Sequence, residues 1–248
     1  MKSVSIRFYE ELNDFLRVEK RKVRFDQDFR GNPSAKDFIE SLGVPHTEVD
    51  LILVNGLSVD FSYLLKDKDD IAVYPVFESM DIGSLQHLRE APLRQPKFIL
   101  DVHLGALAKY LRMLGQDSVY SNSFGDVEII EKSLNEGRAI LTRDTGLLKR
   151  KAVLRGYFVR NIYPEKQVKE VIFRFDLLNS IKLFTRCLLC NGLLKPGSKE
   201  EILEKLPPNV RNNKNEFYIC EACNKIYWQG SHWENMNKLA SRLLVVED

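Results

Sequence analysis

Residues 98–115, with the sequence FILDVHLGALAKYLRMLG, combine a short strand with a helix. The apolar run 98–100 has the length of one buried strand. The leucines that follow lie at the three- and four-residue spacing of one helical face, and they are Leu104, Leu107, Leu111 and Leu114. Gly115 is a typical helix-ending residue. A strand leading directly into an amphipathic helix is the building unit of parallel sheets.

The same alternation continues along the chain. Further short strands are predicted at 118–120, 139–142 and 156–159. Val127, Ile130 and Leu134 repeat the helical spacing, and Gly137 is expected to end that helix. A last helix is predicted at about 165–179. Strands that alternate with helices indicate an α/β domain with a parallel sheet covered on both faces.

The first 80 residues follow a different pattern. Strands are predicted at 4–9, 21–25, 51–54 and 71–77, with a turn at Asn55-Gly56. One helix is predicted at 36–42, after a polar start at 32–35 and before Gly43. Strands joined as hairpins around a single helix indicate a small α+β domain.

Two N-terminal segments carry a family resemblance. LGVPHTEVDLILVNG at 42–56, followed by LLKDKDDIAVYPVF at 64–77, resembles the ubiquitin-like β-grasp proteins that carry sulfur in molybdopterin and thiamine synthesis. Those carriers end in an activated Gly-Gly tail, whereas residues 76–83 read VFESMDIG and the chain continues. We therefore interpret this domain as a binding or scaffolding module, for which a protein is the candidate partner.

The composition is that of a soluble globular protein. The 248 residues are 44% hydrophobic and 29% charged. No apolar run approaches the roughly 20 residues that span a bilayer, and the N-terminus lacks the pattern of a secretory signal. We expect a cytoplasmic protein without a membrane partner. Residues 81–96, with Gly83, Pro92 and Pro96 among charged residues, are predicted to be a linker.

Positive charge is concentrated in one region. Residues 1–80 carry 11 Lys and Arg against 15 Asp and Glu, whereas residues 81–248 carry 26 against 20. Within 143–186 the counts are 11 and 4. A local basic excess suits a polyanionic partner such as RNA, and a solvated surface rich in Lys and Arg is the alternative.

Three aspartates are predicted at one edge of the parallel sheet. Asp101 directly follows the strand 98–100, Asp144 follows the strand 139–142, and Asp126 opens the helix between them. Ligands of such sheets bind at the carboxyl ends of the strands. A few carboxylates, together with water and substrate phosphate, hold Mg²⁺ or Mn²⁺. Asp is also a favoured N-cap, and all three precede helices or turns.

The segments around these acids resemble a nuclease family. FILDVHLGALAKYLRMLGQDSVY at 98–120 and GDVEIIEKSLNEGRAILTRDTGLLKR at 125–150 resemble PIN-like nucleases. The closer resemblance is to the RNase domain of the Mut-seven C-terminal family, a PIN-like domain with its own zinc ribbon. It implies that Asp101, Asp126 and Asp144 hold the catalytic Mg²⁺ or Mn²⁺. Thr145 stands where PIN nucleases often have a fourth acid, so one metal ion is expected.

Five polar residues near the acids are candidate substrate contacts, namely Arg112, Thr142, Arg143, Lys149 and Arg150. Arginine suits bidentate phosphate recognition. For Arg112 the alternative is a structural ion pair with one of the acids. For Thr142 the alternatives are a hydrogen bond to metal-bound water and a simple end to the strand.

The four cysteines fall in two Cys-x-x-Cys pairs, Cys187 with Cys190 and Cys220 with Cys223. Two such pairs in a cytoplasmic protein indicate a structural zinc site, with two redox dithiols as the alternative. Asn191-Gly192 and Asn224-Lys225 supply the turns that such knuckles need. The following aromatic tail, CNKIYWQGSHWENM at 223–236, resembles the end of the same nuclease family. Its aromatic residues are expected to stack on bases or to pack the ribbon.

The predicted architecture has three domains. An α+β, ubiquitin-like β-grasp domain at 1–80 and the linker at 81–96 precede an α/β, PIN-like domain at 97–183. A zinc ribbon with the aromatic tail follows at 184–248. The leading hypothesis is a metal-dependent ribonuclease in which activated water attacks the phosphodiester of single-stranded or structured RNA. The alternatives are an RNA-binding protein with a weak or inactive site and an adaptor that acts through the β-grasp domain.

Overall fold

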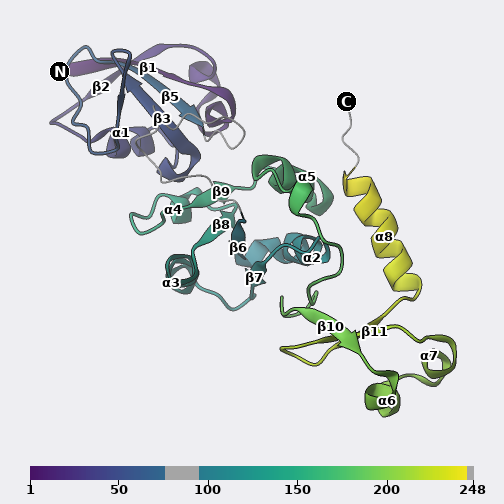
Figure 1. The fold of residues 1–248 in the computed structure, drawn as a ribbon. Coiled ribbons are helices and arrows are strands. Elements are labelled where there is room, and N and C mark those ends of the chain that lie inside the picture. Colours follow the sequence, from purple (N-terminus) through teal and green to yellow (C-terminus); the bar gives the residue numbers. More distant parts are fainter. Residues whose placement is uncertain (76–94, 245–248) are drawn as a thin grey trace. The chain divides into compact units, whose positions relative to one another are not determined.

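A computed structural model describes residues 1–75 and 95–244 (Figure 1). The chain divides into two compact units, Met1–Arg94 with Thr142–Phe158, and Gln95–Leu141 with Val159–Asp248. The predicted linker at 81–96 lies almost wholly outside the described residues, as do Val76 and Phe77 of the last predicted N-terminal strand.

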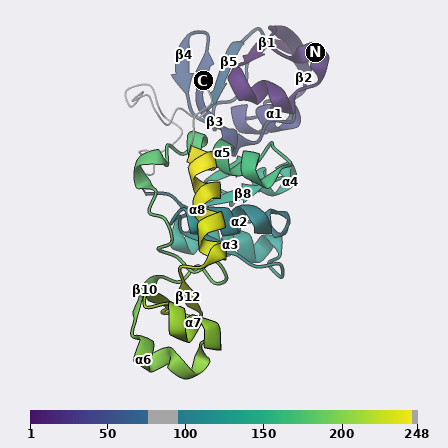
Figure 2. The ribbon, with the colours of Figure 1, turned by 90° about the vertical axis from the view of Figure 1, so that its right-hand side faces the viewer.

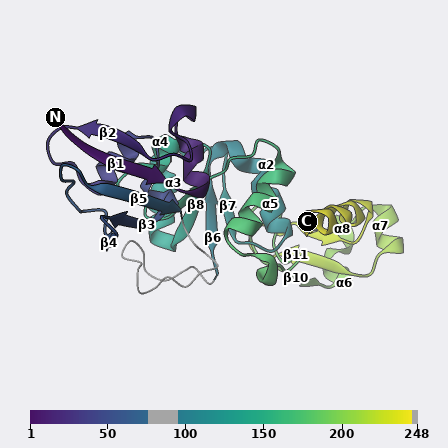
Figure 3. The ribbon, with the colours of Figure 1, turned by 90° about the horizontal axis from the view of Figure 1, so that it is seen from above.

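The N-terminal sheet has five strands in the order β2-β1-β5-β3-β4 (Figure 3). Their bounds are Lys2–Phe8 for β1, Phe25–Phe29 for β2, Val49–Val54 for β3, Leu57–Val59 for β4 and Asp70–Pro75 for β5. β1 pairs with β5 in parallel, and the other pairs are antiparallel. With the single helix α1 (Ala35–Ser41), this topology is that of a β-grasp domain, as predicted.

Local sequence explains most of these elements. α1 begins where the Ser34 side chain accepts a hydrogen bond from the Asp37 amide at 3.1 Å. β3 turns into β4 through Asn55 and Gly56, which both have positive φ, at 51° and 81°, the conformation of a type I′ hairpin. The second strand was predicted four residues too early, because Lys22, with φ of 59°, still belongs to the turn before it.

The second sheet has the order β7-β6-β8-β9, and β6 pairs in parallel with both β7 and β8. The strands are Lys97–Leu100 (β6), Ser118–Tyr120 (β7), Arg138–Thr142 (β8) and Gly156–Phe158 (β9). The helices between and after them are Gly105–Met113 (α2), Asp126–Glu136 (α3), Thr145–Leu148 (α4) and Pro164–Arg174 (α5). The predicted α/β alternation with a parallel sheet is confirmed.

Two helices differ from their predicted form. In α3 the buried residues are Ile129, Ile130 and Ser133, whereas Val127 is 63% exposed. Ser133 is inside because its hydroxyl donates to the Arg138 carbonyl at 2.6 Å. More than one face of this helix carries residues at the helical spacing. The spacing alone therefore does not identify which face is buried.

The helix α5 ends at Arg174, five residues before the predicted end. Asp176 adopts a left-handed φ of 47°, and the Leu177 amide donates to the Ile172 carbonyl at 3.0 Å. This is the hydrogen-bond pattern of a Schellman C-cap, which usually has glycine at the position that Asp176 occupies. The turn brings Leu177 into the core, where it is fully buried.

The C-terminal region forms a small antiparallel sheet, β10-β11-β12, with bounds Leu194–Gly197, Phe217–Cys220 and Ile226–Trp228. The long insert between the cysteine pairs holds α6 (Lys199–Ile202) and α7 (Pro208–Asn213). It builds a core of its own from Ile202, Leu206, Val210 and Phe217. The last helix, α8 (Ser231–Leu244), packs against α5 (Figure 2). None of the helices in the described ranges is long and apolar enough to cross a membrane.

Candidate functional site

Asp101 lies where β6 leaves the parallel sheet. Leu100 is in register with Leu141 of β8, and the Asp101 amide donates to the Leu141 carbonyl at 3.0 Å. The Asp101 carboxylate accepts from the Val102 amide at 2.6 Å and is 7% exposed. Asp101 is therefore the N-cap of a short 3-10 helix, Val102–Leu104, at the carboxyl ends of two neighbouring strands.

Asp144 follows Leu141 by three residues and is exposed. The buried Thr142 hydroxyl accepts from the Asp144 amide at 2.9 Å. Asp144 Oδ1 accepts from the Gly146 amide at 2.7 Å, which makes Asp144 the N-cap of α4. Thr142 thus shapes the turn that presents Asp144.

Asp126 is the first residue of α3 and is half-buried. Asp101 and Asp126 lie in one compact unit, and Asp144 is grouped with the other. In the described part of the chain, three or more metal-ligand atoms gather within 4.8 Å only at the four cysteines.

Arg112 serves the fold. Its side chain is 2% exposed, and Nε donates to the Ser118 carbonyl at 2.8 Å. Nη1 donates to the carbonyls of Leu188 and Leu189, at 3.1 and 2.8 Å, within the first cysteine knuckle. Burial lowers the pKa of Arg112 below its ordinary value. The three partners of these hydrogen bonds are main-chain carbonyls, so the structure favours a role of Arg112 in the fold over the predicted phosphate contact.

The other candidate substrate contacts lie between β8 and β9. The Arg143 guanidinium lies 6.0 Å from the centre of the Phe158 ring. Lys149 is half-buried, and its Nζ donates to the Glu40 carbonyl at 2.9 Å. Arg150 is exposed. Lys149 thus already has a partner within the chain.

The four cysteines come together as a metal-binding group. Cys187 and Cys223 have their Sγ atoms 3.6 Å apart, and those of Cys190 and Cys220 are 3.4 Å apart. Zn–S bonds of about 2.3 Å in a tetrahedron place sulfurs about 3.8 Å apart. The close pairs join one knuckle to the other, whereas a redox dithiol would pair within one Cys-x-x-Cys. The group fits a metal ion such as zinc.

The two knuckles have the same backbone design. Asn191 and Asn224 have left-handed φ values of 73° and 57°, and each donates its amide to the carbonyl of the first cysteine of its pair at 3.0 Å. A Cβ on Gly192 would lie 2.9 Å from Cys220 Sγ. Only glycine leaves room for the sulfur at this position. The left-handed φ values of Asn191 and Asn224 confirm the predicted turns.

Aromatic residues of the tail pack within the ribbon. The Tyr227 hydroxyl lies 3.1 Å from Cys187 Sγ and accepts from the Leu188 amide at 3.1 Å. Burial raises the pKa of Tyr227, and the adjacent Cys187 adds to the effect. The Tyr227 hydroxyl thus bridges the Cys187 sulfur and the Leu188 amide of the first knuckle. Trp233 stacks on Phe184 with ring centres 3.8 Å apart, as expected for a packing role.

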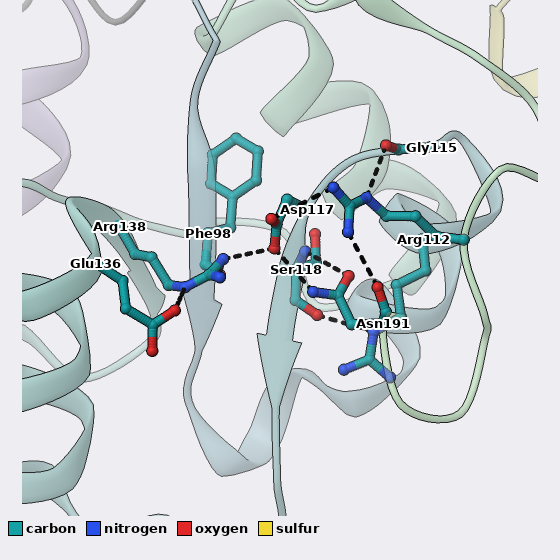
Figure 4. A network of polar contacts seen from close by, with 9 residues as sticks. Phe98, Arg112, Gly115, Asp117, Ser118, Glu136, Arg138 and Asn191 are labelled. Carbon is teal, nitrogen blue, oxygen red and sulfur yellow. Dashed lines mark hydrogen bonds and ion pairs between the residues drawn. The ribbon is translucent and has the colours of Figure 1, made fainter. Parts of the chain in front are cut away.

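Asp117 joins the first knuckle to the parallel sheet (Figure 4). Its Oδ1 accepts from Arg138 at 2.6 Å and from Asn191 Nδ2 at 2.8 Å, and Oδ2 lies 3.3 Å from Arg186. Asn191 Oδ1 in turn accepts from the Ser118 amide at 2.9 Å. Burial alone would raise the pKa of Asp117, but the hydrogen bonds and charges of these partners hold it below its ordinary value.

This network was not found from the sequence. Asn191 was interpreted only as a turn residue, and Asp117 belongs to no motif. The available signal was indirect: Gly115, which ends α2, has a φ of 83°, and a Cβ there would lie 2.3 Å from the Lys182 carbonyl. A glycine that permits such an approach indicates that a distant segment packs on the α2–β7 turn.

Two family models match the chain. The family model described as Mut7-C RNAse domain matches residues 96–240, and the one described as Mut7-C ubiquitin matches residues 1–81. Among solved structures, the crystal structure of SAMP1 from Haloferax volcanii is 15% identical, covering 32% of this chain and 99% of that chain, with a TM-score of 0.25. No curated protein matches the chain. Because the RNAse-domain model matches more than half of its residues, the chain belongs to the Mut7-C RNAse domain family.

Proposed function

We propose that the chain is a metal-dependent ribonuclease that hydrolyses RNA phosphodiester bonds. The supporting observation is the hydrogen bond from the Asp101 amide to the Leu141 carbonyl, which joins the carboxyl ends of β6 and β8. Asp144 follows Leu141 by three residues. Both acids therefore leave the sheet at the edge where ligands of parallel sheets bind. Membership of a ribonuclease family supports the same reaction.

The donor set suits a hard divalent cation. Mg²⁺ is typically held by one or two carboxylates, with water and substrate phosphate completing its shell, so three closely gathered carboxylates are not required. Asp101, Asp126 and Asp144 would be its ligands. Bound there, Mg²⁺ or Mn²⁺ would lower the pKa of water and offset charge on the phosphodiester.

The remaining residues orient and attract the substrate. Thr142 fixes the turn at Asp144 through its bond to the Asp144 amide. Arg143 and Arg150 flank this turn and supply positive charge for RNA phosphates. The zinc ribbon has a structural role in this proposal: with four cysteine ligands, zinc has no open position for water or substrate.

Cleavage of a labelled mixed-sequence RNA tests the proposal. The full-length chain is assayed with Mg²⁺ or Mn²⁺ and with EDTA, beside Asp144→Asn and Glu131→Gln. Glu131 is an exposed carboxylate on α3, the helix that begins with Asp126. We expect metal-dependent cleavage that falls at least about 100-fold in Asp144→Asn, because a metal ligand is lost. Glu131→Gln should cut like the parent. Equal cleavage by Asp144→Asn would reject Asp144 as a ligand.

A second candidate is an RNA-binding protein with a weak or inactive nuclease site. Two observations favour it: Asp101 and Asp144 both cap helices, and Thr145 replaces a fourth acid. The same experiment separates the two candidates when RNA binding is measured beside cleavage. Binding without metal-dependent cleavage by the parent chain supports the second candidate.

A further inference from the structure

The segment Thr142–Phe158, which carries Asp144, shares a compact unit with the β-grasp domain. His46, in the turn that precedes β3, holds the middle of this segment. Its Nδ1 lies 2.6 Å from Glu40 Oε1, and its Nε2 lies 2.8 Å from the Val153 carbonyl oxygen. His46 is 8% exposed and Val153 is buried, so this contact is sheltered from water.

The end of the segment is held as well. The Phe158 amide donates to Glu48 Oε1 at 2.6 Å, and the Phe158 ring packs edge-on against Phe15 with centres 5.4 Å apart. Glu48 is 1% exposed. A carboxylate is buried at high cost unless it accepts hydrogen bonds, so the contact between Glu48 and Phe158 is a specific part of the domain's structure.

The third contact reaches the acid itself through a short helix. Asp144 is the N-cap of α4, and Lys149 is its C-cap. Lys149 Nζ donates to the Glu40 carbonyl at the end of α1. Because α4 is a single hydrogen-bonded turn, holding Lys149 against the β-grasp domain also restrains Asp144. The contacts of Lys149, Val153 and Phe158 then fix the segment at three points.

We propose that the β-grasp domain acts in cis, with the chain's own Asp144 segment as its protein partner and with His46, Glu48 and the Glu40 carbonyl as positioning groups. The sequence VFESMDIG at 76–83, which continues instead of ending in Gly-Gly, agrees with a supporting role. The consequence for RNA cleavage rests on the proposed function, whereas the support of the segment does not.

Two lysines of the same basic stretch provide a matched test. Lys149 contacts the β-grasp domain, and Lys151 is exposed. Hydrogen–deuterium exchange is measured on the full-length parent, Lys149→Ala, Lys151→Ala and His46→Ala. Exchange of amides in 145–158 should become about tenfold faster in Lys149→Ala and His46→Ala, as expected for losing one hydrogen bond of a charged or buried group. Lys151→Ala should match the parent.

Unchanged exchange in Lys149→Ala and His46→Ala overturns the proposal, whatever the chain does to RNA. If His46→Ala fails to fold, Lys149→Ala alone decides. Cleavage kinetics add a second readout: a positioning role lowers kcat in His46→Ala and Lys149→Ala at unchanged KM, whereas a phosphate contact raises KM in both lysine variants. A raised KM in both lysine variants, with kcat unchanged in His46→Ala, also overturns the positioning role. If the parent chain does not cut RNA, the proposed function is rejected. The exchange measurement then still decides whether the β-grasp domain holds the Asp144 segment.

Discussion

The cysteine group and the acidic edge were both predicted as metal sites, yet the structure assembles them differently. The four Sγ atoms lie within 4.8 Å of one another, in two knuckles with matching turns. At the edge of the parallel sheet, Asp101 and Asp144 each accept a hydrogen bond from an amide of the helix or turn that follows them. A structural metal site is completed by the chain alone, whereas a catalytic Mg²⁺ site leaves positions to water and substrate.

The two regions also differ in how they are held. Arg112 and Asn191 connect the first knuckle to β7, and Asp117 joins that contact to Arg138 of β8. The knuckle is therefore part of the same hydrogen-bonded structure as the parallel sheet. The Asp144 segment is instead held by residues of the β-grasp domain. The cysteine group thus depends on contacts with the parallel sheet, and the Asp144 segment depends on contacts with the β-grasp domain. Variants of these contacts should therefore affect one region without the other.

Loss of a cysteine ligand should have the largest effect. Cys187→Ser removes a ligand from the group, and metal binding in such small domains supplies folding free energy. We expect loss of the bound metal and a drop of at least about 4 kcal/mol in the free energy of unfolding. Metal content per chain and urea unfolding measure both. Tyr227→Phe is the control: it loses only the hydroxyl contacts, at about 1 kcal/mol, and keeps its metal. A Cys187→Ser protein with full metal content would contradict the assignment.

The support of the knuckle should give the next largest effect. Asp117→Ala leaves Arg138 and Arg186 without their shared carboxylate, and we expect a loss of about 2 kcal/mol, below that of a fully buried pair because Asp117 is partly exposed. Urea unfolding measures it. Glu136→Ala removes the more exposed partner of the same Arg138 and should cost at most about 0.5 kcal/mol. Equal losses would show that the Asp117 network does not hold the knuckle.

At the acidic edge, capping and metal binding make different demands on Asp144. Asparagine caps a helix about as well as aspartate, whereas alanine costs about 1 kcal/mol. We therefore expect Asp144→Asn to unfold like the parent and Asp144→Ala to lose up to about 1 kcal/mol, with cleavage lost in both. Urea unfolding and RNA cleavage are measured on the same preparations. If Asp144→Asn still cleaves RNA, Asp144 is not a metal ligand and acts only as the N-cap of α4.

Features set by neighbouring residues were predictable from the sequence. The strands of the parallel sheet, the cysteine turns and the end of α2 at Gly115 each follow from a few adjacent residues. Asp101 and Asp144 were found because a strand end followed by an acid is a local pattern. The same pattern is typical of helix caps, and both acids have capping contacts in the structure.

Features that depend on distant partners were not predictable. Asp117 is the centre of a network whose members include Asn191 and Arg186, each more than 65 residues away in the sequence. Arg112 looked like a phosphate contact, since its sequence gives no sign of the carbonyls of Leu188 and Leu189. Lys149 likewise donates to the carbonyl of Glu40, which lies more than 100 residues away in the sequence. In each case a polar side chain bonds to a residue that is distant in the sequence. Only folding brings the two residues together.

Acid titration should give the smallest effect and tests the same comparison. The pKa of Asp117 is held below its ordinary value of 3.8, so the folded chain binds fewer protons there than the unfolded chain. The resulting stability is present above about pH 4 and is lost as the pH falls through the lowered pKa. Asp117→Asn should therefore have a flatter decline of the unfolding free energy with acid than the parent.

Urea unfolding at a series of pH values below 5 measures this decline. Acid also protonates cysteine ligands and weakens metal binding, but both proteins keep all four cysteines, so their difference isolates Asp117. Asp144→Asn is the matched control, because Asp144 is exposed and its carboxylate accepts from the neutral Gly146 amide. If Asp144→Asn flattened the acid decline as much as Asp117→Asn, the acidic edge would contain an ion pair as strong as that of the knuckle support, and the contrast between the two regions would fail.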